Sequence, residues 1–167
     1  MTTSVKRHRQ DFMVDGIVVS DETDEHIKGF FGKWRDLSNF GKGKVTMDGR
    51  TFYTSEAAYM AQKTFDPEEK DALATIREGK DAKKYGQTVK LRPDWDDVRV
   101  EAMERVLLAK FLQNPELAEL LLSTGNKYLE ETNWWNDTFW GVCGGVGENH
   151  LGQCLMRVRH QLRSITL

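Results

Sequence analysis

Cysteine, proline and long apolar runs are all scarce in this chain. Its 167 residues include two cysteines, Cys143 and Cys154, and three prolines. Two cysteines are too few for a disulfide framework, which argues against a small disulfide-rich secreted fold and favours a reducing, cytoplasmic location. No segment approaches the roughly 20 apolar residues that span a bilayer, so we expect no membrane partner.

Net charge is also small. The chain has 24 Lys and Arg against 26 Asp and Glu, a formal net charge of −2, so the molecule as a whole does not attract nucleic acid electrostatically. Residues 1–10 are basic, but no apolar run follows them, and we expect no secretory signal. We interpret residues 1–25 as a polar N-terminal extension with strand-forming residues, and residues 26–167 as the main domain.

The apolar content of the sequence is sufficient for one folded domain. Hydrophobic residues make up 39% and aromatic residues 10% of the chain, which is more than disordered proteins contain. The length fits one domain with a sizeable core. Strand signals come first and helix signals dominate afterwards, which predicts an α+β fold: a single compact, mainly helical domain with a small antiparallel sheet.

Four short segments carry strand or turn signals. Asp-Gly pairs at positions 15–16 and 48–49 are typical of two-residue hairpin turns, and β-branched or aromatic residues flank both pairs. The predicted strand segments are Phe12–Ser20, Phe30–Phe31, Lys44–Tyr53 and Lys127–Thr132.

Capping residues and prolines mark the helix starts. Thr54 offers an N-cap hydroxyl, and Asp66-Pro67 and Asn114-Pro115 each place proline at a first helical position. Apolar residues then recur at helical spacing. The predicted helices run from Glu56 to about Phe65, from Pro67 to near Gly79, from after Pro93 to about Gln113, from Glu116 to Ser123 and from Leu151 to about Ser164.

A first group of reactive side chains lies in the predicted helix that begins at Glu56. If the helix continues to Lys63, Glu56 and Lys63 share one face, because seven residues are close to two turns. A carboxylate and an amine on one face can act as base and nucleophile. The simpler alternative is an acidic residue that complements the helix dipole and a solvated lysine.

The segment Asn133–Gly141 is the densest aromatic stretch of the chain. Four aromatic residues alternate with Asn and Asp, including Asp137 beside Trp140. Indole rings offer stacking surfaces for nucleobases, and amides and carboxylates hydrogen-bond to ring edges. An aromatic core corner closed by polar turn residues explains the composition equally well, and both interpretations stay open.

Glycines follow immediately, from Gly141 to Gly152. Glycine-rich backbone before a helix can present N–H groups to a phosphate, whereas a flexible turn is the simpler alternative. The segment lacks the Gly-Lys-Ser/Thr of a Walker loop and the third glycine of a dinucleotide fingerprint. Cys143, His150 and Cys154 lack the paired spacing of a metal site, and we predict none.

Taken together, these segments resemble the NADAR family over about residues 29–162. Six pieces match in order, and their order makes the resemblance specific. They are Phe30-Phe31 with Asp36–Phe40, the hairpin from Asp48-Gly49 to Tyr53, Thr54–Glu56 with Ala61–Lys63, Leu91-Arg92 with Trp95, Asp137 with Trp140-Gly141, and Asn149 with Leu151-Gly152.

The resemblance implies an N-glycosidase in a compact α+β domain, which would span residues 26–167. It implies cleavage of the C–N bond of a phosphorylated riboside. One implied substrate group is ADP-ribose linked to guanine, including ADP-ribosylated nucleic acid. The other is the ribosylaminopyrimidine intermediates of riboflavin synthesis. It implies no metal, no cofactor and no obligate protein partner.

The resemblance also implies roles for particular residues. Glu56 and Asp137 are expected to act as base or charge stabiliser, because carboxylates fill such roles in glycosidases. Lys63 is expected to form a Schiff base with C1′ of the opened ribose. The residues expected to bind the base, ribose or phosphate are Arg35, Asn39, Trp95, Trp140, Gly141 and Asn149.

Two substitutions depart from the family pattern. The family usually has histidine where this chain has Ala57, and glutamine where it has Met60. Glu56 and Lys63 are retained beside them, so the departures bear on the substrate rather than on the reaction. The rival hypothesis is a non-catalytic module that binds ADP-ribose or a nucleotide through its tryptophans and glycines. The retained carboxylates and lysine favour catalysis, because a stacking module needs neither.

Overall fold

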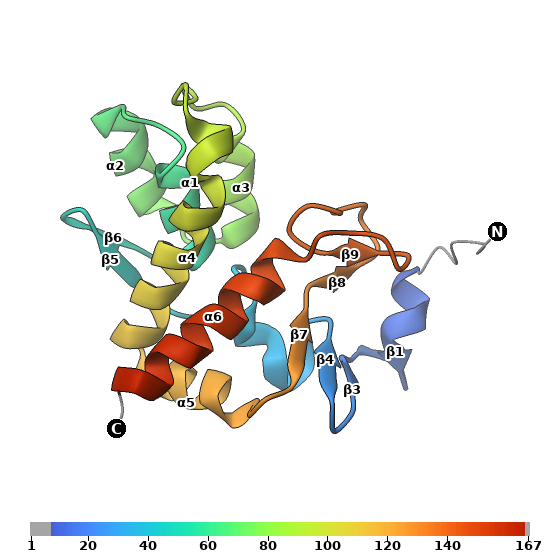
Figure 1. Cartoon of the computed structure of the whole chain (residues 1–167). Coiled ribbons are helices and arrows are strands. Elements are labelled where there is room, and N and C mark those ends of the chain that lie inside the picture. The colour runs from blue at the N-terminus through green and yellow to red at the C-terminus, as the bar shows by residue number, and fades with distance from the viewer. Residues whose placement is uncertain (1–7, 166–167) are drawn as a thin grey trace.

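Two long helices form the centre of the molecule. The computed structural model describes residues 8–165. Helices α4 (Trp95–Gln113) and α6 (His150–Ile165) pack against each other along their length. Figure 1 shows α1, α2 and α3 gathered around the N-terminal half of α4, with the β5–β6 hairpin beside α4 and the other short strands on the far side of α6. The fold is a single mainly helical α+β domain, as the sequence predicts.

The remaining helices are short. Two of the starts are fixed by the predicted caps: the Thr54 hydroxyl accepts a hydrogen bond from the N–H of Ala57, and Asp66 accepts from Glu68. The other helices are α1 (Ser55–Ala61), α2 (Pro67–Thr75), α3 (Gly79–Gly86) and α5 (Pro115–Ser123), with 3-10 helices η1 (Arg9–Phe12) and η2 (Gly32–Leu37).

The strands form four small sheets rather than one. Strands β1 (Met13–Val14) and β2 (Ile17–Val18), and β5 (Val45–Met47) and β6 (Arg50–Phe52), are antiparallel hairpins whose Asp-Gly turns have positive φ at both residues. Two pairs are parallel, which the sequence does not predict: β4 with β7, and β8 with β9. The strands of these two pairs are β4 (His26–Lys28), β7 (Tyr128–Glu130), β8 (Thr132–Asn133) and β9 (Val142–Cys143). Strand β3 (Asp21–Glu22) pairs antiparallel with β4.

Three predicted boundaries are wrong. The helix that begins at Ser55 ends at Ala61, so Lys63 lies beyond it. The helix that begins at Pro67 ends at Thr75, and Gly79 begins a further helix, α3, instead of ending the previous one. Phe30-Phe31 is not a strand; the strand nearby is β4. Short elements of this kind are set by tertiary packing more than by local propensity.

A buried lysine ties η2 to the core. Lys110 of α4 is fully buried, and its Nζ donates to the carbonyl oxygens of Asp36 (2.7 Å) and Ser38 (3.0 Å). Burial lowers the pKa of Lys110 to about 7. The two hydrogen bonds satisfy the end of η2 and fix the start of the loop that carries Asn39.

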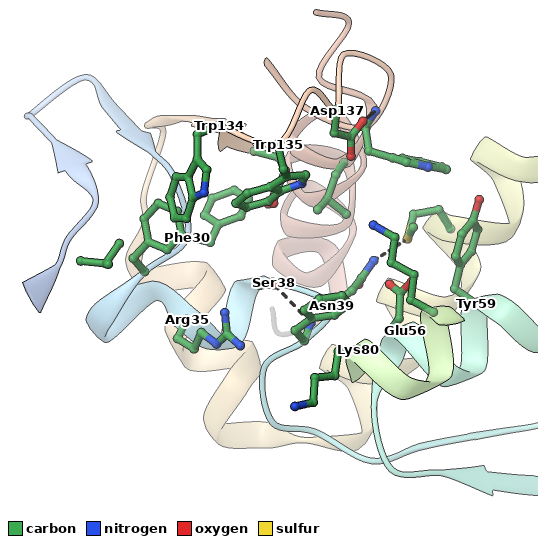
Figure 2. Close-up of a pocket in the computed structure, with 18 of the residues that line it drawn as sticks. Phe30, Arg35, Ser38, Asn39, Glu56, Tyr59, Lys80, Trp134, Trp135 and Asp137 are labelled. Carbon is green, nitrogen blue, oxygen red and sulfur yellow. Dashed lines mark hydrogen bonds between the residues drawn. The ribbon is translucent and has the colours of Figure 1, made fainter. Parts of the chain in front are cut away.

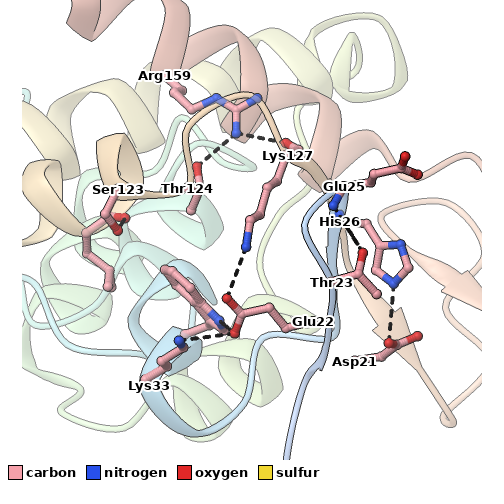
Figure 3. A network of polar contacts seen from close by, with 12 residues as sticks. Asp21, Glu22, Thr23, Glu25, His26, Lys33, Ser123, Thr124, Lys127 and Arg159 are labelled. Atoms are coloured by element: carbon pink, nitrogen blue, oxygen red, sulfur yellow. Dashed lines mark hydrogen bonds and ion pairs between the residues drawn. The ribbon is translucent and has the colours of Figure 1, made fainter.

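A polar network anchors the N-terminal strands (Figure 3). Glu22 of β3 accepts hydrogen bonds from the Trp34 indole (2.9 Å) and from Lys127 (3.2 Å), and pairs with Lys33. The Trp34 hydrogen bond holds the pKa of Glu22 below its usual range. Arg159 of α6 donates to the Lys127 carbonyl at 2.9 Å. Residues distant in sequence are thereby joined across β3, η2 and α6.

The described part of the N-terminal extension packs on the main domain. Phe12 is 3% exposed, and its ring lies 5.6 Å from Phe31 and 5.3 Å from Trp134, centroid to centroid. Strand β3 pairs with β4 across the boundary that the sequence suggests at residue 25. Lys6 and Arg7 of the predicted basic tail lie outside the described residues. Within residues 8–165, no helix combines the length and apolar character needed to cross a bilayer.

Candidate active site

A cavity of about 870 Å³ opens where η2, α1, α3 and the segment after β7 meet. Its size falls in the range of ligand pockets that enclose most of a drug-sized molecule. Figure 2 shows Glu56 and Tyr59 at one side and Trp134 and Phe30 at the other, with Trp135 and Asp137 between them. Of the residues predicted for the site, those lining it are Glu56, Asp137, Arg35, Asn39 and Trp140.

Glu56 is buried at the end of the cavity that Tyr59 of the same helix also lines. It lies in the first turn of α1 and is 7% exposed, and its N–H donates to the carbonyl of Asn39 at 3.2 Å. Burial raises the pKa of Glu56 to about 7, although the charges of Lys83 and Lys63 act in the opposite direction. Near neutral pH the carboxyl can therefore exist in both forms, which suits proton transfer.

Glu131 is a second buried carboxyl that sequence reasoning missed. Its Oε2 has no hydrogen-bond partner among the described residues. Burial raises its pKa to about 8, and the charges of Asp137 and Glu56 add to the rise. A carboxyl with this pKa is mostly protonated at pH 7 and can donate a proton. No local pattern in the sequence signals it, because Glu131 follows the end of β7 and the strand residue Glu130 before it is also buried.

Asp137 is held by a local turn. Its Oδ1 accepts hydrogen bonds from the backbone N–H groups of Phe139 (3.2 Å) and Trp140 (2.9 Å). The buried Asn133 amide donates to the Asp137 carbonyl at 2.8 Å. These contacts explain the alternation of polar and aromatic residues here: the polar side chains build the turn, and the turn places a third carboxylate and an indole on the cavity.

Four cations also line the cavity: Arg9, Arg35, Lys80 and Lys83. Within residues 8–165, none of them forms a side-chain hydrogen bond or an ion pair. Unpaired cations around a concave site attract anions. Sequence reasoning identified Arg35 and missed Arg9, Lys80 and Lys83, because it read residues 1–25 as a tail and overlooked α3.

Two glycines allow α3 to pack close to α1 and to the end of the cavity that Glu56 lines. A Cβ on Gly86 would overlap the Met60 side chain of α1, and a Cβ on Gly79 would lie 2.7 Å from Cδ1 of Phe40. Both positions therefore require glycine for close packing. Met60 itself lines the cavity, whereas Ala57 is fully buried in the core. The family departure at position 60 thus changes the cavity wall, and the one at position 57 does not.

Lys63 is not among the residues that line the cavity. It follows the end of α1, and its Nζ donates to the Gly86 carbonyl at the end of α3, 3.0 Å away. Burial lowers the pKa of Lys63, and the charge of Glu56 opposes that shift. In this arrangement Lys63 contacts the end of α3, and Lys80 and Lys83 are the lysines that line the cavity with Glu56.

Three further residues predicted for the site, Trp95, Gly141 and Asn149, contact residues that line the cavity. The Trp95 ring packs 5.2 Å from Tyr59, whose other neighbour is Trp140 at 5.4 Å. The Asn149 Oδ1 accepts a hydrogen bond from the N–H of Glu131 at 3.0 Å. Gly141 lies so close to the Glu131 carbonyl that a Cβ would collide with it. All three position lining residues without lining the cavity themselves.

The glycine-rich segment, residues 141–152, packs against neighbouring backbone and contributes little to the cavity lining. Cβ atoms on Gly147 and Gly152 would collide with the carbonyls of Gly141 and Leu129, respectively. Of residues 141–152, only Leu151 lines the cavity. The phosphate role considered for this segment is therefore not supported by its position, whereas the four cations do line the cavity.

One buried amide atom lacks a partner at the centre of the cavity. Asn39 is 7% exposed; its Nδ2 contacts the Met103 sulfur at 3.2 Å, and its Oδ1 has no hydrogen-bond partner among the described residues. An unpaired buried oxygen is costly, and a ligand hydroxyl or amine would satisfy it. Within residues 8–165 no group of three or more His, Cys, Asp or Glu side chains is arranged to hold a metal ion.

Comparison with known proteins agrees with this geometry. The NADAR domain model matches residues 21–163. The chain belongs to the NADAR family. It is 38% identical to the N-glycosidase YbiA of Escherichia coli over 131 residues, which cover 76% of this chain and 81% of YbiA. The NMR structure of YbiA superposes with a TM-score of 0.76 and 34% identity, covering 87% of this chain and 89% of that one.

Other NADAR relatives extend the comparison. An N-glycosidase of Nostoc punctiforme is 34% identical over 81% of this chain and 92% of its own length. A riboflavin biosynthesis protein of Vibrio vulnificus is 38% identical over 76% of this chain, but the match covers only 35% of that longer protein. Relatives that align over most of their length are thus hydrolases of N-glycosyl bonds.

Proposed function

We propose that this NADAR protein hydrolyses the C–N glycosidic bond of a phosphorylated riboside. The observation that carries the proposal is one cavity in which Glu56, Glu131, Asp137 and Lys83 meet at one end and further unpaired cations line the wall. Cleaving a ribose C1′–N bond develops positive charge on the sugar and negative charge on the base. Carboxylates stabilise the first charge, and a protonated carboxyl neutralises the second.

In the direct route, water attacks C1′ and loses its proton to the Glu56 carboxylate. The C1′–N bond breaks, its electron pair moves to the base nitrogen, and Glu131 supplies the proton that this nitrogen takes up. Asp137, on the same cavity, stabilises the oxocarbenium-like sugar. The pKa values of about 7 for Glu56 and about 8 for Glu131 suit this division into base and acid.

In the covalent route, a lysine amine attacks C1′ and displaces the base. The sugar ring opens to an imine, water adds to the imine carbon, and the amine is released with the free sugar. The sequence predicts Lys63 for this role, and its lowered pKa favours a neutral amine. We assign the role first to Lys83, because Lys83 lines the cavity and Lys63 is engaged with Gly86.

Borohydride trapping distinguishes the two lysines. Borohydride reduces an imine to a stable amine, so turnover in its presence should add the sugar mass to the peptide that contains Lys83. A K83A variant should lose the adduct, while K84A, an exposed neighbour on α3, should keep it. An adduct at Lys63 would restore the sequence prediction, and no adduct at either lysine during turnover would leave the direct route alone.

The preferred substrate is ADP-ribose linked to guanine, including guanine in nucleic acid; a ribosylaminopyrimidine of riboflavin synthesis is the second. Four unpaired cations on a cavity of about 870 Å³ suit a substrate with more than one phosphate. Incubation with each substrate and chromatography of the released base compare them directly. Because both cysteines are free, we expect the protein to act in the cytoplasm.

The alternative function is a non-catalytic module that binds ADP-ribose or a nucleotide. The exposed Trp135 indole and the cavity cations are the features that favour it. Binding of ADP-ribose without release of base from either substrate would establish the module and exclude the enzyme. Three carboxyl groups at one end of the cavity argue for catalysis, because they weaken the binding of an anion.

A further inference from the structure

The end of the cavity opposite Glu56 is partly built by a segment that precedes the NADAR match. Arg9 of η1 and Val18 of β2 both line the cavity, whereas the family model begins at residue 21. The hairpin of β1 and β2 reaches this position because Phe12 is buried against Phe31 and Trp134. This wall therefore lies outside the residues that the family model matches.

Aromatic rings form the inner surface of this wall. Phe31 and Trp134 stack with their centroids 5.4 Å apart, and Trp135 meets Trp134 edge-on at 4.9 Å. Trp135 is nevertheless 43% exposed. An indole supported on its edge and open at the cavity is a ready stacking platform for a planar ring.

Two guanidinium groups accompany the aromatic rings. Arg9 and Arg35 line the cavity without side-chain ion pairs in the described chain. Figure 2 shows Arg35 on the side of Trp134 and Phe30, away from Asp137 and Tyr59. Guanidinium groups bind phosphate oxygens in a bidentate manner. The two arginines thus add anion recognition to the stacking surface.

We infer that the N-terminal hairpin, with Arg9 and the Trp135 platform, forms a second subsite that binds the nucleoside diphosphate part of a substrate. In this arrangement the reacting ribose lies beside Glu56 and Asp137, and a second planar base stacks on Trp135 with its phosphates on Arg9. The inference rests on the proposed function for which bond is cut, but it concerns binding at a different end of the cavity. It assigns residues 8–20 the selection of a diphosphate over a monophosphate riboside.

Calorimetric titration of the full chain with ADP tests the subsite without requiring turnover. We expect R9Q and W135A each to raise the Kd for ADP about tenfold, as expected for loss of one stacking or one charged contact. Ribose 5-phosphate, which lacks the second base, should bind equally to the wild type and both variants. R105A, which removes an exposed arginine from α4 away from the cavity, should change neither Kd.

The outcomes separate this inference from the proposed function. If ADP binding depends on Arg9 and Trp135 but no base is released from any riboside, the subsite stands and the glycosidase proposal fails. If ADP does not bind, or binds R9Q and W135A as well as the wild type, the subsite is overturned whatever the activity. Equal weakening of ribose 5-phosphate and ADP would also overturn it, because both ligands would then share one site.

Discussion

Three carboxyl groups within one cavity set the chemistry at the scale of the residue. Glu56 and Glu131 are desolvated, so their pKa values rise to about 7 and about 8, and Asp137 raises both further by its charge. The environment makes Glu56 the easier group to ionise and Glu131 the easier one to keep protonated.

A bell-shaped pH profile of kcat follows from this difference. The rate should rise as Glu56 ionises near pH 7 and fall as Glu131 loses its proton near pH 8. E131Q should lower kcat about a hundredfold and remove the alkaline limb of the profile. Initial rates of base release between pH 5 and 9 measure both effects. An unchanged alkaline limb in E131Q would contradict the role of Glu131 as proton donor.

The buried carboxyl of Glu131 should also affect stability. Its pKa is raised in the folded state, so the folded protein binds the proton more tightly than the unfolded chain does. The stabilisation is complete below about pH 4.5 and is lost as pH rises toward about 8. Relative to the wild type, E131Q should therefore gain in free energy of unfolding between pH 5 and pH 8.

Urea titrations at several pH values measure this difference. E116Q, which changes an exposed glutamate on α5, is the matched control and should show no such trend. A free-energy difference between E131Q and the wild type that stays constant over this range would show that Glu131 titrates alike in the folded and unfolded states. The account of a desolvated acid would then be wrong.

At the scale of the element, the position of α3 decides which lysine meets Glu56. Lys80 and Lys83 reach the cavity because Gly86 packs on Met60 and Gly79 packs on Phe40. Lys63 adds a hydrogen bond to the Gly86 carbonyl. Because α3 is otherwise short and polar, these contacts largely determine its position.

G86A tests this dependence. An added Cβ would overlap the Met60 side chain and push α3 outward, with a cost of about 1–3 kcal/mol in unfolding free energy. We expect kcat to fall further than this loss of stability explains, since Lys83 moves with the helix. K84A on the exposed face of α3 serves as control. Full activity in a folded G86A protein would show that Lys83 does not need its present position.

Sequence reasoning predicted the elements that have strong local signals. Helices α4, α5 and α6 and both Asp-Gly hairpins follow from prolines, caps and periodicity, which act within a few residues. It missed α3, because Gly79 resembles a helix stop, and glycine at both ends of the helix is explained only by contacts with Phe40 and Met60. It extended α1 to Phe65, whereas the helix ends at Ala61; the charge of Glu56 nevertheless acts on Lys63.

At the scale of the whole molecule, the cavity joins segments that are distant in the chain. Glu56 and Asp137 were predicted from local composition and the family resemblance, and both line the cavity. Arg9, Lys83 and Glu131 were not predicted, because their neighbours in space are not their neighbours in sequence. For the glycine-rich segment the sequence leaves a phosphate-binding role and a plain turn both open, and Gly141, Gly147 and Gly152 are in close backbone packing.

The N-terminal extension also has a different role when the whole molecule is considered. Residues 1–25 were predicted as a polar extension with strand-forming residues, and the described part contains η1, β1, β2 and β3. Phe12 is buried against the aromatic cluster, and Arg9 lies on the cavity. The segment that precedes the NADAR match thus contributes Arg9 and Val18 to the wall of the candidate site.

The most direct test of the account is base release from ADP-ribosylated guanine by the wild type and by E56Q, which keeps the shape of the side chain but cannot accept a proton. We predict release of free guanine by the wild type and a loss of about a hundredfold or more in E56Q, with circular dichroism showing both folded. Base release by folded E56Q at the wild-type rate would contradict the central claim, as would a wild type that releases base from neither this substrate nor the ribosylaminopyrimidine.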